Sequence, residues 1–112
     1  MILIDAIEND LNQKIVCVQE NNETFDLTLR HDATSQKWYF GIEKDDFIIN
    51  NATLVLHPNI LRQFKNIINF GLMVVSNDGL DPAFENDFIS RVSVYILSQD
   101  EVEEFEERYF NK

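Results

Sequence analysis

Short runs of alternating apolar and polar residues, separated by polar turns, constrain the fold of this chain most strongly. In residues 25–30 every second side chain is apolar, which is the period of a strand with one buried face. Residues 37–42 repeat the pattern after a polar turn at residues 32–35, and residues 14–20 are rich in β-forming side chains. These three runs predict an antiparallel meander with short loops.

Three further runs extend this pattern toward the C-terminus. Residues 47–56 predict a fourth strand region, with a possible bulge at Asn50 and Asn51 and an end before Pro58. Residues 59–66 fit one helical turn or a bulky loop. Residues 70–75 and 91–97 predict two more strands, and a turn sequence, Asn-Asp-Gly, follows the first of them.

The last residues change from strand to helix character. Ser98 and Glu101 have the spacing of a capping box, and a helix is expected over residues 99–109. Spacings of three and four residues place Val102, Phe105 and Tyr109 on one stripe. We expect this stripe to dock on the sheet or on a neighbouring protein, and the candidate partner interface consists of Val102, Phe105, Tyr109 and Phe110.

Together these elements predict a mainly β fold: one small antiparallel β-barrel or sandwich of about six strands with an acidic C-terminal α-helix. The 112 residues fit a single domain, with a β-rich body at 14–97 and the helix at 98–110. Nine Phe, three Tyr and one Trp supply large core side chains, and Trp38 is expected to be buried. Cys17 is the only cysteine, so no internal disulfide forms, and we interpret it as a core residue.

The charge of the chain limits its partners. Twenty Asp and Glu against nine Lys and Arg give a net charge of −11, which disfavours sequence-specific nucleic-acid binding and anionic membranes. No basic leader and no spanning apolar stretch is present, so synthesis in the cytoplasm is expected. Simple solubility explains much of the charge. The alternative is an acidic surface that repels DNA or meets basic partners, with Asp78, Asp81, Glu85 and Asp87 as its candidate residues.

Catalytic and metal-binding signals are weak. The acids of residues 78–87 lack the spacing of a calcium loop. No nucleophile motif and no Gly-rich phosphate loop is present. His31 and His57 both lie at strand ends, and a small hydrolase would need one of them in a cleft with acids. We therefore expect no enzyme activity, no cofactor and no metal.

The order and spacing of several segments resemble the baseplate plug proteins of contractile-tailed bacteriophages. The segments are the paired strands at 25–30 and 37–42, the apolar connection at 52–61, residues 71–79 with Asp81-Pro82 after them, and the tract at 87–97. The resemblance covers residues 14–97. The chain departs from the family pattern at residues 63–69, which are rich in Asn and Lys and lack glycines, and in the helix after Leu97.

This resemblance implies a virion structural protein, a plug or hub component where the tail tube meets the spike. Such a protein acts by packing and strand pairing against other baseplate, hub and tube proteins, as an oligomer within the assembly and without turnover. It would be located in the tail baseplate of the virion and made in the cytoplasm of the bacterial host. The alternative hypothesis is an acidic inhibitor that mimics DNA and blocks a nucleic-acid-binding enzyme.

Overall fold

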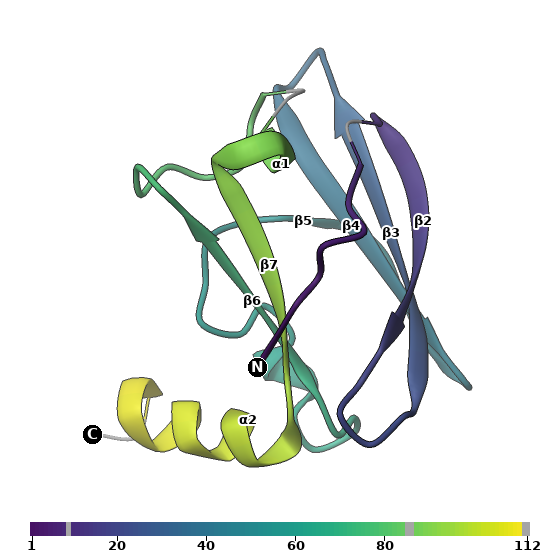
Figure 1. The fold of residues 1–112 in the computed structure, drawn as a ribbon, viewed down its shortest axis with the longest axis vertical. Coiled ribbons are helices and arrows are strands. Elements are labelled where there is room, and N and C mark those ends of the chain that lie inside the picture. The colour runs from purple at the N-terminus through teal and green to yellow at the C-terminus, as the bar shows by residue number, and fades with distance from the viewer. Residues whose placement is uncertain (9, 85–86, 111–112) are drawn as a thin grey trace.

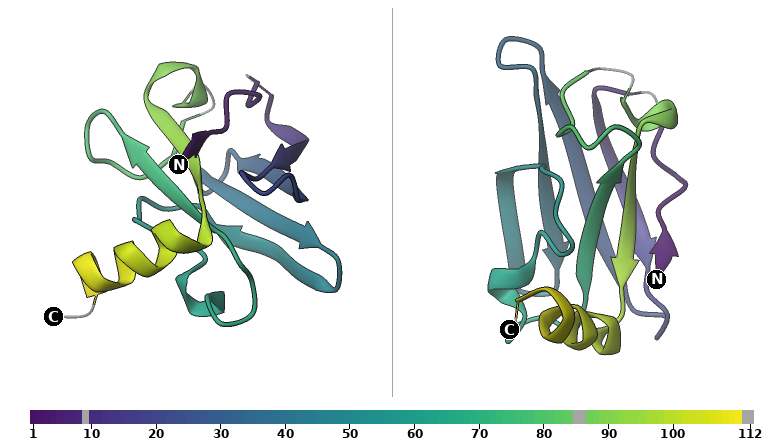
Figure 2. Two further views of the ribbon diagram at one scale, coloured as in Figure 1. Left: turned by 60° about the horizontal axis from the view of Figure 1, so that its bottom comes forward. Right: turned by 90° about the vertical axis from the view of Figure 1, so that its left-hand side faces the viewer.

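Two antiparallel sheets and a C-terminal helix make up the computed structural model (Figure 1), which describes residues 1–8, 10–84 and 87–110. The sheets form two layers (Figure 2). Apolar side chains fill the space between them. Seven strands are present in the described residues. The predicted mainly β fold is confirmed. It is a sandwich, because the strands form two separate sheets and do not close into a barrel.

The larger sheet is a meander whose strands follow chain order. It consists of β2 (Asn12–Val18), β3 (Thr24–Asp32), β4 (Lys37–Lys44) and β5 (Phe47–Thr53). All three neighbouring pairs are antiparallel, as the short polar turns between them require. The predicted three-strand meander is confirmed, and β5 extends it by one strand.

The smaller sheet has the order β1-β7-β6. β6 (Gly71–Ser76) and β7 (Val92–Leu97) agree with the predicted runs, and β1 (Ile2–Leu3) adds an edge strand that was not predicted. The backbone N–H of Ile4 continues this pairing with a 2.9 Å hydrogen bond to the carbonyl of Val94.

A bulge lies in β5 where the sequence suggested one. The register runs from Phe40 opposite Ala52 to Ile42 opposite Ile49, so Gly41 faces two residues of β5. Asn51 adopts a positive φ of 54°, which Asn tolerates better than most residues. A Cβ atom on Gly41 would lie only 2.9 Å from the carbonyl oxygen of Ile49, so the close approach of the strands requires glycine here.

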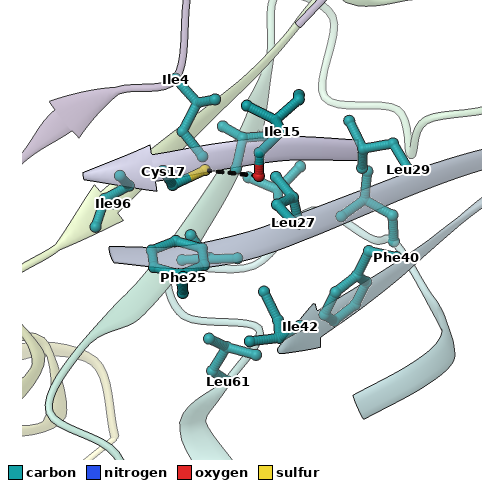
Figure 3. Packing of buried hydrophobic residues seen from close by; sticks show 14 of the residues in the cluster. Ile4, Ile15, Cys17, Phe25, Leu27, Leu29, Phe40, Ile42, Leu61 and Ile96 are labelled. Carbon is teal, nitrogen blue, oxygen red and sulfur yellow. Dashed lines mark hydrogen bonds between the residues drawn. The ribbon is translucent and has the colours of Figure 1, made fainter. Parts of the chain in front are cut away.

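The inner faces of both sheets form one apolar core. Phe25, Leu27 and Leu29 of β3 alternate into it with Ile15 and Cys17 of β2, as Figure 3 shows. The indole ring of Trp38 is buried as well. The expectations that Cys17 and Trp38 belong to the core are therefore confirmed.

The connection between the sheets is less regular than predicted. Strand β5 ends at Thr53, so residues 54–56 are not part of it, and an isolated bridge between His57 and Val74 links the connection to β6. One 3₁₀ turn, η1 (Arg62–Phe64), fulfils the expected helical turn. The short helix α1 (Asp87–Ser90) was not predicted. The C-terminal helix starts as α2 (Gln99–Phe105) and continues as the π-helical turn η2 (Glu106–Phe110).

Candidate functional site

The carboxylate of Asp87 organises the loop before β7. Its side chain is only 2% exposed, and its Oδ2 accepts hydrogen bonds from the backbone N–H groups of Ala83 at 2.6 Å and Phe84 at 2.8 Å. Arg91 donates to both carboxylate oxygens, from Nη2 at 2.6 Å and from Nε at 2.9 Å. Asp87 thus fixes the loop backbone and the end of α1 at the same time.

Opposing effects act on the pKa of Asp87. Burial favours the neutral acid, but the hydrogen bonds from Arg91, Ala83 and Phe84 and the charge of Arg91 outweigh it, so the pKa lies below its ordinary value. The pKa of Arg91 is raised, chiefly by its hydrogen bond to Asp87. Both groups therefore remain charged at neutral pH, and their pairing offsets the burial of the carboxylate.

The larger sheet holds the same loop from the other side. The Nε2 of His31 donates to the carbonyl of Ala83 at 2.7 Å, and Trp38 Nε1 donates to the carbonyl of Phe84 at 2.9 Å. The ring of Phe88 meets Trp38 edge to face with 4.9 Å between centroids. These contacts and Asp87 form a loop clamp, which we define as Asp87, Arg91, His31 and Trp38.

The described acidic residues of this loop all accept hydrogen bonds within the chain, and of these Asp78 and Asp81 remain exposed at the surface. Asp78 accepts hydrogen bonds from Arg91, Leu80 and Ser76, and Asp81 accepts one from the backbone N–H of Leu56. Glu85 lies outside the described residues. The assignment of Asp87 to an exposed acidic surface is wrong, because the charge of Arg91 and two backbone donors draw its carboxylate inside.

The start of the C-terminal helix has the predicted capping box. Ser98 Oγ accepts the backbone N–H of Glu101, and the Glu101 side chain accepts the backbone N–H of Ser98. Val102 and Phe105 are buried beside Leu97, with Met73 packed against them. Docking of these two side chains on the body of the protein is therefore confirmed.

The end of the helix departs from the predicted stripe. Tyr109 is 46% exposed, and its ring centroid lies 5.4 Å from that of Phe105 and 6.5 Å from that of Phe110. Phe110 instead faces the body, where it stacks on His57 at 5.5 Å and lies under the guanidinium of Arg62 at 4.0 Å. The backbone over these residues is a π-helical turn, so side-chain directions differ there from those that α-helical spacing predicts. Tyr109 is therefore not buried on the body of the protein, and its burial against a partner, the other alternative, stays a prediction.

Ion pairs fix η2 to the 3₁₀ turn. Glu106 accepts hydrogen bonds from Arg62 Nε at 2.7 Å and from Lys65 Nζ at 3.0 Å. Burial of the Glu106 carboxylate opposes its ionisation, but these two cations hold its pKa below the ordinary value. Of the candidate interface residues, Val102, Phe105 and Phe110 are thus engaged by the chain itself, and Tyr109 is left exposed.

His57 belongs to a structural turn. Its Nδ1 accepts the backbone N–H of Asn59 at 2.9 Å. The buried side chain of Asn59 in turn accepts the N–H groups of Leu61 and Leu72, which joins the connection to β6. Sequence reasoning missed Asn59, although a Pro-Asn pair is a typical start for such a turn. Among the described residues, no hydrogen bond joins a carboxylate to His57 or to His31, and both rings bond backbone groups.

The surface grooves have linings of mixed polar and apolar side chains. A groove of about 780 Å³ runs between residues 44–47 and 65–69 and is lined by lysine, asparagine, acidic and apolar side chains. Within the described ranges, no three His, Cys, Asp or Glu side chains gather closely enough to hold a metal ion. None of the helices described is both long and apolar enough to cross a bilayer.

Several large apolar side chains remain exposed. They are Val16 and Val18 on β2, Ile48 on β5, Ile67 after η1, Leu80 and Phe84 in the loop before α1, and Tyr109 on η2. They are scattered over different elements and line no shared cleft. Apolar side chains scattered singly in this way are common on protein surfaces and by themselves mark no binding site.

A family model matches most of the sequence. It is described as cyanophage baseplate Pam3 plug gp18, and it covers residues 1–100. The match takes in both sheets and the loop clamp and ends within the first turn of α2. No curated protein matches the chain. Since the matched segment includes every described strand, the chain belongs to the Pam3 gp18 family of cyanophage baseplate plugs.

Proposed function

We propose that this chain is a structural component of a phage tail baseplate, a plug or hub part at the junction of tail tube and spike. It acts by packing against other baseplate, hub and tube proteins and performs no chemical turnover. The observation that carries this proposal is the family match over residues 1–100. The family match supports the proposal, whereas fold alone does not fix function.

The side chains of the protein support a structural role. His31 and His57, the residues a hydrolase would need, bind backbone groups of their own chain. The thiol of Cys17 is buried, and burial raises its pKa to about 12, so it is not a ready nucleophile at neutral pH. What remains available on the surface is apolar side chains and exposed acids.

The exposed end of the C-terminal helix is the proposed contact for a neighbouring protein. Tyr109 presents an aromatic ring there, and aromatic residues are favoured at interface centres. The acids on the outer side of the helix, Glu103, Glu104 and Glu107, are exposed, so a basic surface is the matching partner. This part of the chain lies beyond the family match, and the contact is therefore proposed as specific to this chain.

The net charge of −11 supports a location beside the path of DNA. A surface of like charge repels phosphates and limits sticking of the genome as it passes. The DNA-mimic alternative receives less support, because Asp78, Asp81 and Asp87 bind groups of their own chain. An inhibitor of that kind would need those carboxylates free and evenly spaced along one face.

The test is genetic complementation in the phage that encodes the chain. Deleting the gene should give particles with defective or missing tails, and the wild-type chain supplied in trans should restore them. The Tyr109→Ala variant should restore fewer complete tails, whereas Arg108→Ala, a control at the neighbouring exposed position, should restore them fully. Complete, infectious particles from the deletion phage would exclude the proposed role.

A further inference from the structure

Three hollows of the surface meet at Asn69 and Gln99. Their volumes are about 780, 210 and 410 Å³, and both residues line all three, so the hollows adjoin and form one groove. The turn between β2 and β3, the segment before β6 and the start of α2 surround it at the lower end of the molecule in Figure 1. We call it the amide groove after the five amide side chains that line it: Gln19, Asn21, Asn66, Asn69 and Gln99.

The side chain of Gln19 is a buried donor without an acceptor. Gln19 is only 6% exposed, and in the part of the chain that the structure describes its Nε2 has no hydrogen-bond partner. Its backbone serves the turn, where the N–H donates to the carbonyl of Glu23 at 2.8 Å and the carbonyl accepts the N–H of Asn22 at 3.0 Å. An unpaired buried donor destabilises a fold, and native proteins keep few of them. Because Gln19 lines the groove, an acceptor on a chain bound there would complete its hydrogen bonding.

The groove is also strongly acidic. Seven acidic residues line it against two lysines. Both lysines are already paired, Lys44 with Glu23 and Lys65 with Glu106. The six acidic residues other than Glu106 are exposed. Charge complementarity therefore favours a cationic occupant and disfavours an anionic one such as nucleic acid.

We propose that the amide groove holds an extended segment of a neighbouring protein that is rich in lysine or arginine. The carbonyl groups of such a segment accept from Gln19 and the other amides, and its N–H groups donate to the amide oxygens. Its cationic side chains meet the exposed acids of the groove. A polyamine would match the charge, but its protonated amines are donors alone and leave Gln19 Nε2 unpaired. A peptide supplies both the charge and the acceptor.

This inference deepens the proposed function. It rests on the role as an assembly part of the baseplate, and it gives the chemistry of one partner. Tyr109 is not among the residues that line the amide groove. The groove and the contact at the end of the C-terminal helix are therefore tested by different variants.

Peptide binding followed by nuclear magnetic resonance tests the groove in the isolated full chain. The probe is a peptide of about eight alternating lysine and threonine residues with both ends blocked, because threonine favours an extended backbone. We expect it to shift the side-chain amide signals of Gln19 and Asn69. The same peptide with glutamate in place of lysine should leave these signals unchanged, and so should spermidine.

Two charge reversals on α2 separate the groove from general electrostatic attraction. Glu103→Lys changes a residue that lines the groove, whereas Glu104→Lys changes an exposed neighbour outside it. Both variants change the net charge by the same amount. Glu103→Lys should weaken binding of the lysine peptide about tenfold, and Glu104→Lys should leave it within about twofold of the wild type.

Replacing Gln19 with Leu separates assembly from stability. Leu keeps the volume of the side chain and removes the unpaired donor, so urea unfolding should show equal or greater stability. Supplied in trans to the deletion phage, Gln19→Leu should nevertheless restore fewer complete tails than the wild-type chain.

Four results would overturn the groove proposal and leave the baseplate role intact. They are no binding of the lysine peptide, a Gln19 signal that spermidine shifts as well, equal loss of binding with Glu103→Lys and Glu104→Lys, and full restoration of tails by Gln19→Leu. Complete tails from the deletion phage itself would exclude the baseplate role, and the peptide titration would still decide whether the groove binds a basic segment.

Discussion

The carboxylate of Asp87 and the guanidinium of Arg91 lie one helical turn apart and form a two-point ion pair, 2.6 Å from Oδ2 to Nη2 and 2.9 Å from Oδ1 to Nε. The pair joins the first residue of α1 to the residue that follows the helix. Asp87 also binds the loop that His31 and Trp38 hold from the larger sheet. A contact between neighbours in the sequence thus joins the two layers of the sandwich.

Replacing Asp87 with Asn should destabilise the protein by about 3 kcal/mol, because it removes the buried charge that pairs with Arg91 at two points and weakens the acceptor of the Ala83 and Phe84 N–H groups. Urea unfolding followed by Trp38 fluorescence measures this change. Asp100→Asn, at an exposed position on α2, is the matched control and should change the free energy of unfolding by less than about 0.5 kcal/mol. Equal stability of the two variants would contradict the structural role of the loop clamp.

The pKa of Asp87 makes stability depend on pH in the acid range. Because the folded pKa lies below the unfolded value, the contribution of this group is fully present above the unfolded pKa of about 4 and is lost as pH falls through the folded pKa. The free energy of unfolding of the wild type should therefore decline more steeply below about pH 4 than that of Asp87→Asn. Parallel pH profiles of the two proteins would show that the carboxylate is not stabilised by folding.

Phe105 and Tyr109 should respond differently to truncation. Phe105→Ala removes a buried ring beside Leu97 and Met73 and should cost about 3–4 kcal/mol. Tyr109→Ala removes a half-exposed ring and should cost less than about 1 kcal/mol in the isolated chain. Thermal unfolding of both variants measures the difference. A large loss for Tyr109→Ala would mean that its ring packs on the body, and would remove it as a free contact for a partner.

The thiol of Cys17 should be unreactive in the folded protein. Burial raises its pKa to about 12, so the neutral thiol is favoured, and its contribution to stability is lost only as pH rises above the unfolded value toward that pKa. A thiol reagent at mildly alkaline pH should modify Cys17 slowly in buffer and rapidly in denaturant. Rapid modification in both conditions would show that β2 opens readily from the sheet.

Local patterns were sufficient to predict most of the strands. The alternation in β3 and β4 reports one buried face directly, and the bulge in β5 follows from two asparagines opposite Gly41. β1 escaped prediction because two residues are too few to show a period. The capping box at Ser98 was predictable because all of its contacts are local.

The candidate site depended on contacts that sequence spacing does not encode. Asp87 was assigned to the surface because acids in loops are usually exposed. Its burial depends on Arg91 and on a loop backbone held by Trp38, which is 46 residues away from Phe84 in sequence. The helical stripe could not show that Tyr109 stays exposed, because the spacing changes there from α-helical to π-helical and Phe110 contacts His57 and Arg62.

Cryo-electron microscopy of virions from the phage that encodes this chain tests the central claim most directly. The account predicts density for the two-sheet sandwich at the tip of the tail tube, in contact with hub or spike proteins. Localised reconstruction of tails that carry the chain fused to a small fluorescent domain would identify that density. Complete tails whose tip is fully explained by other proteins, with no density for this sandwich, would contradict it.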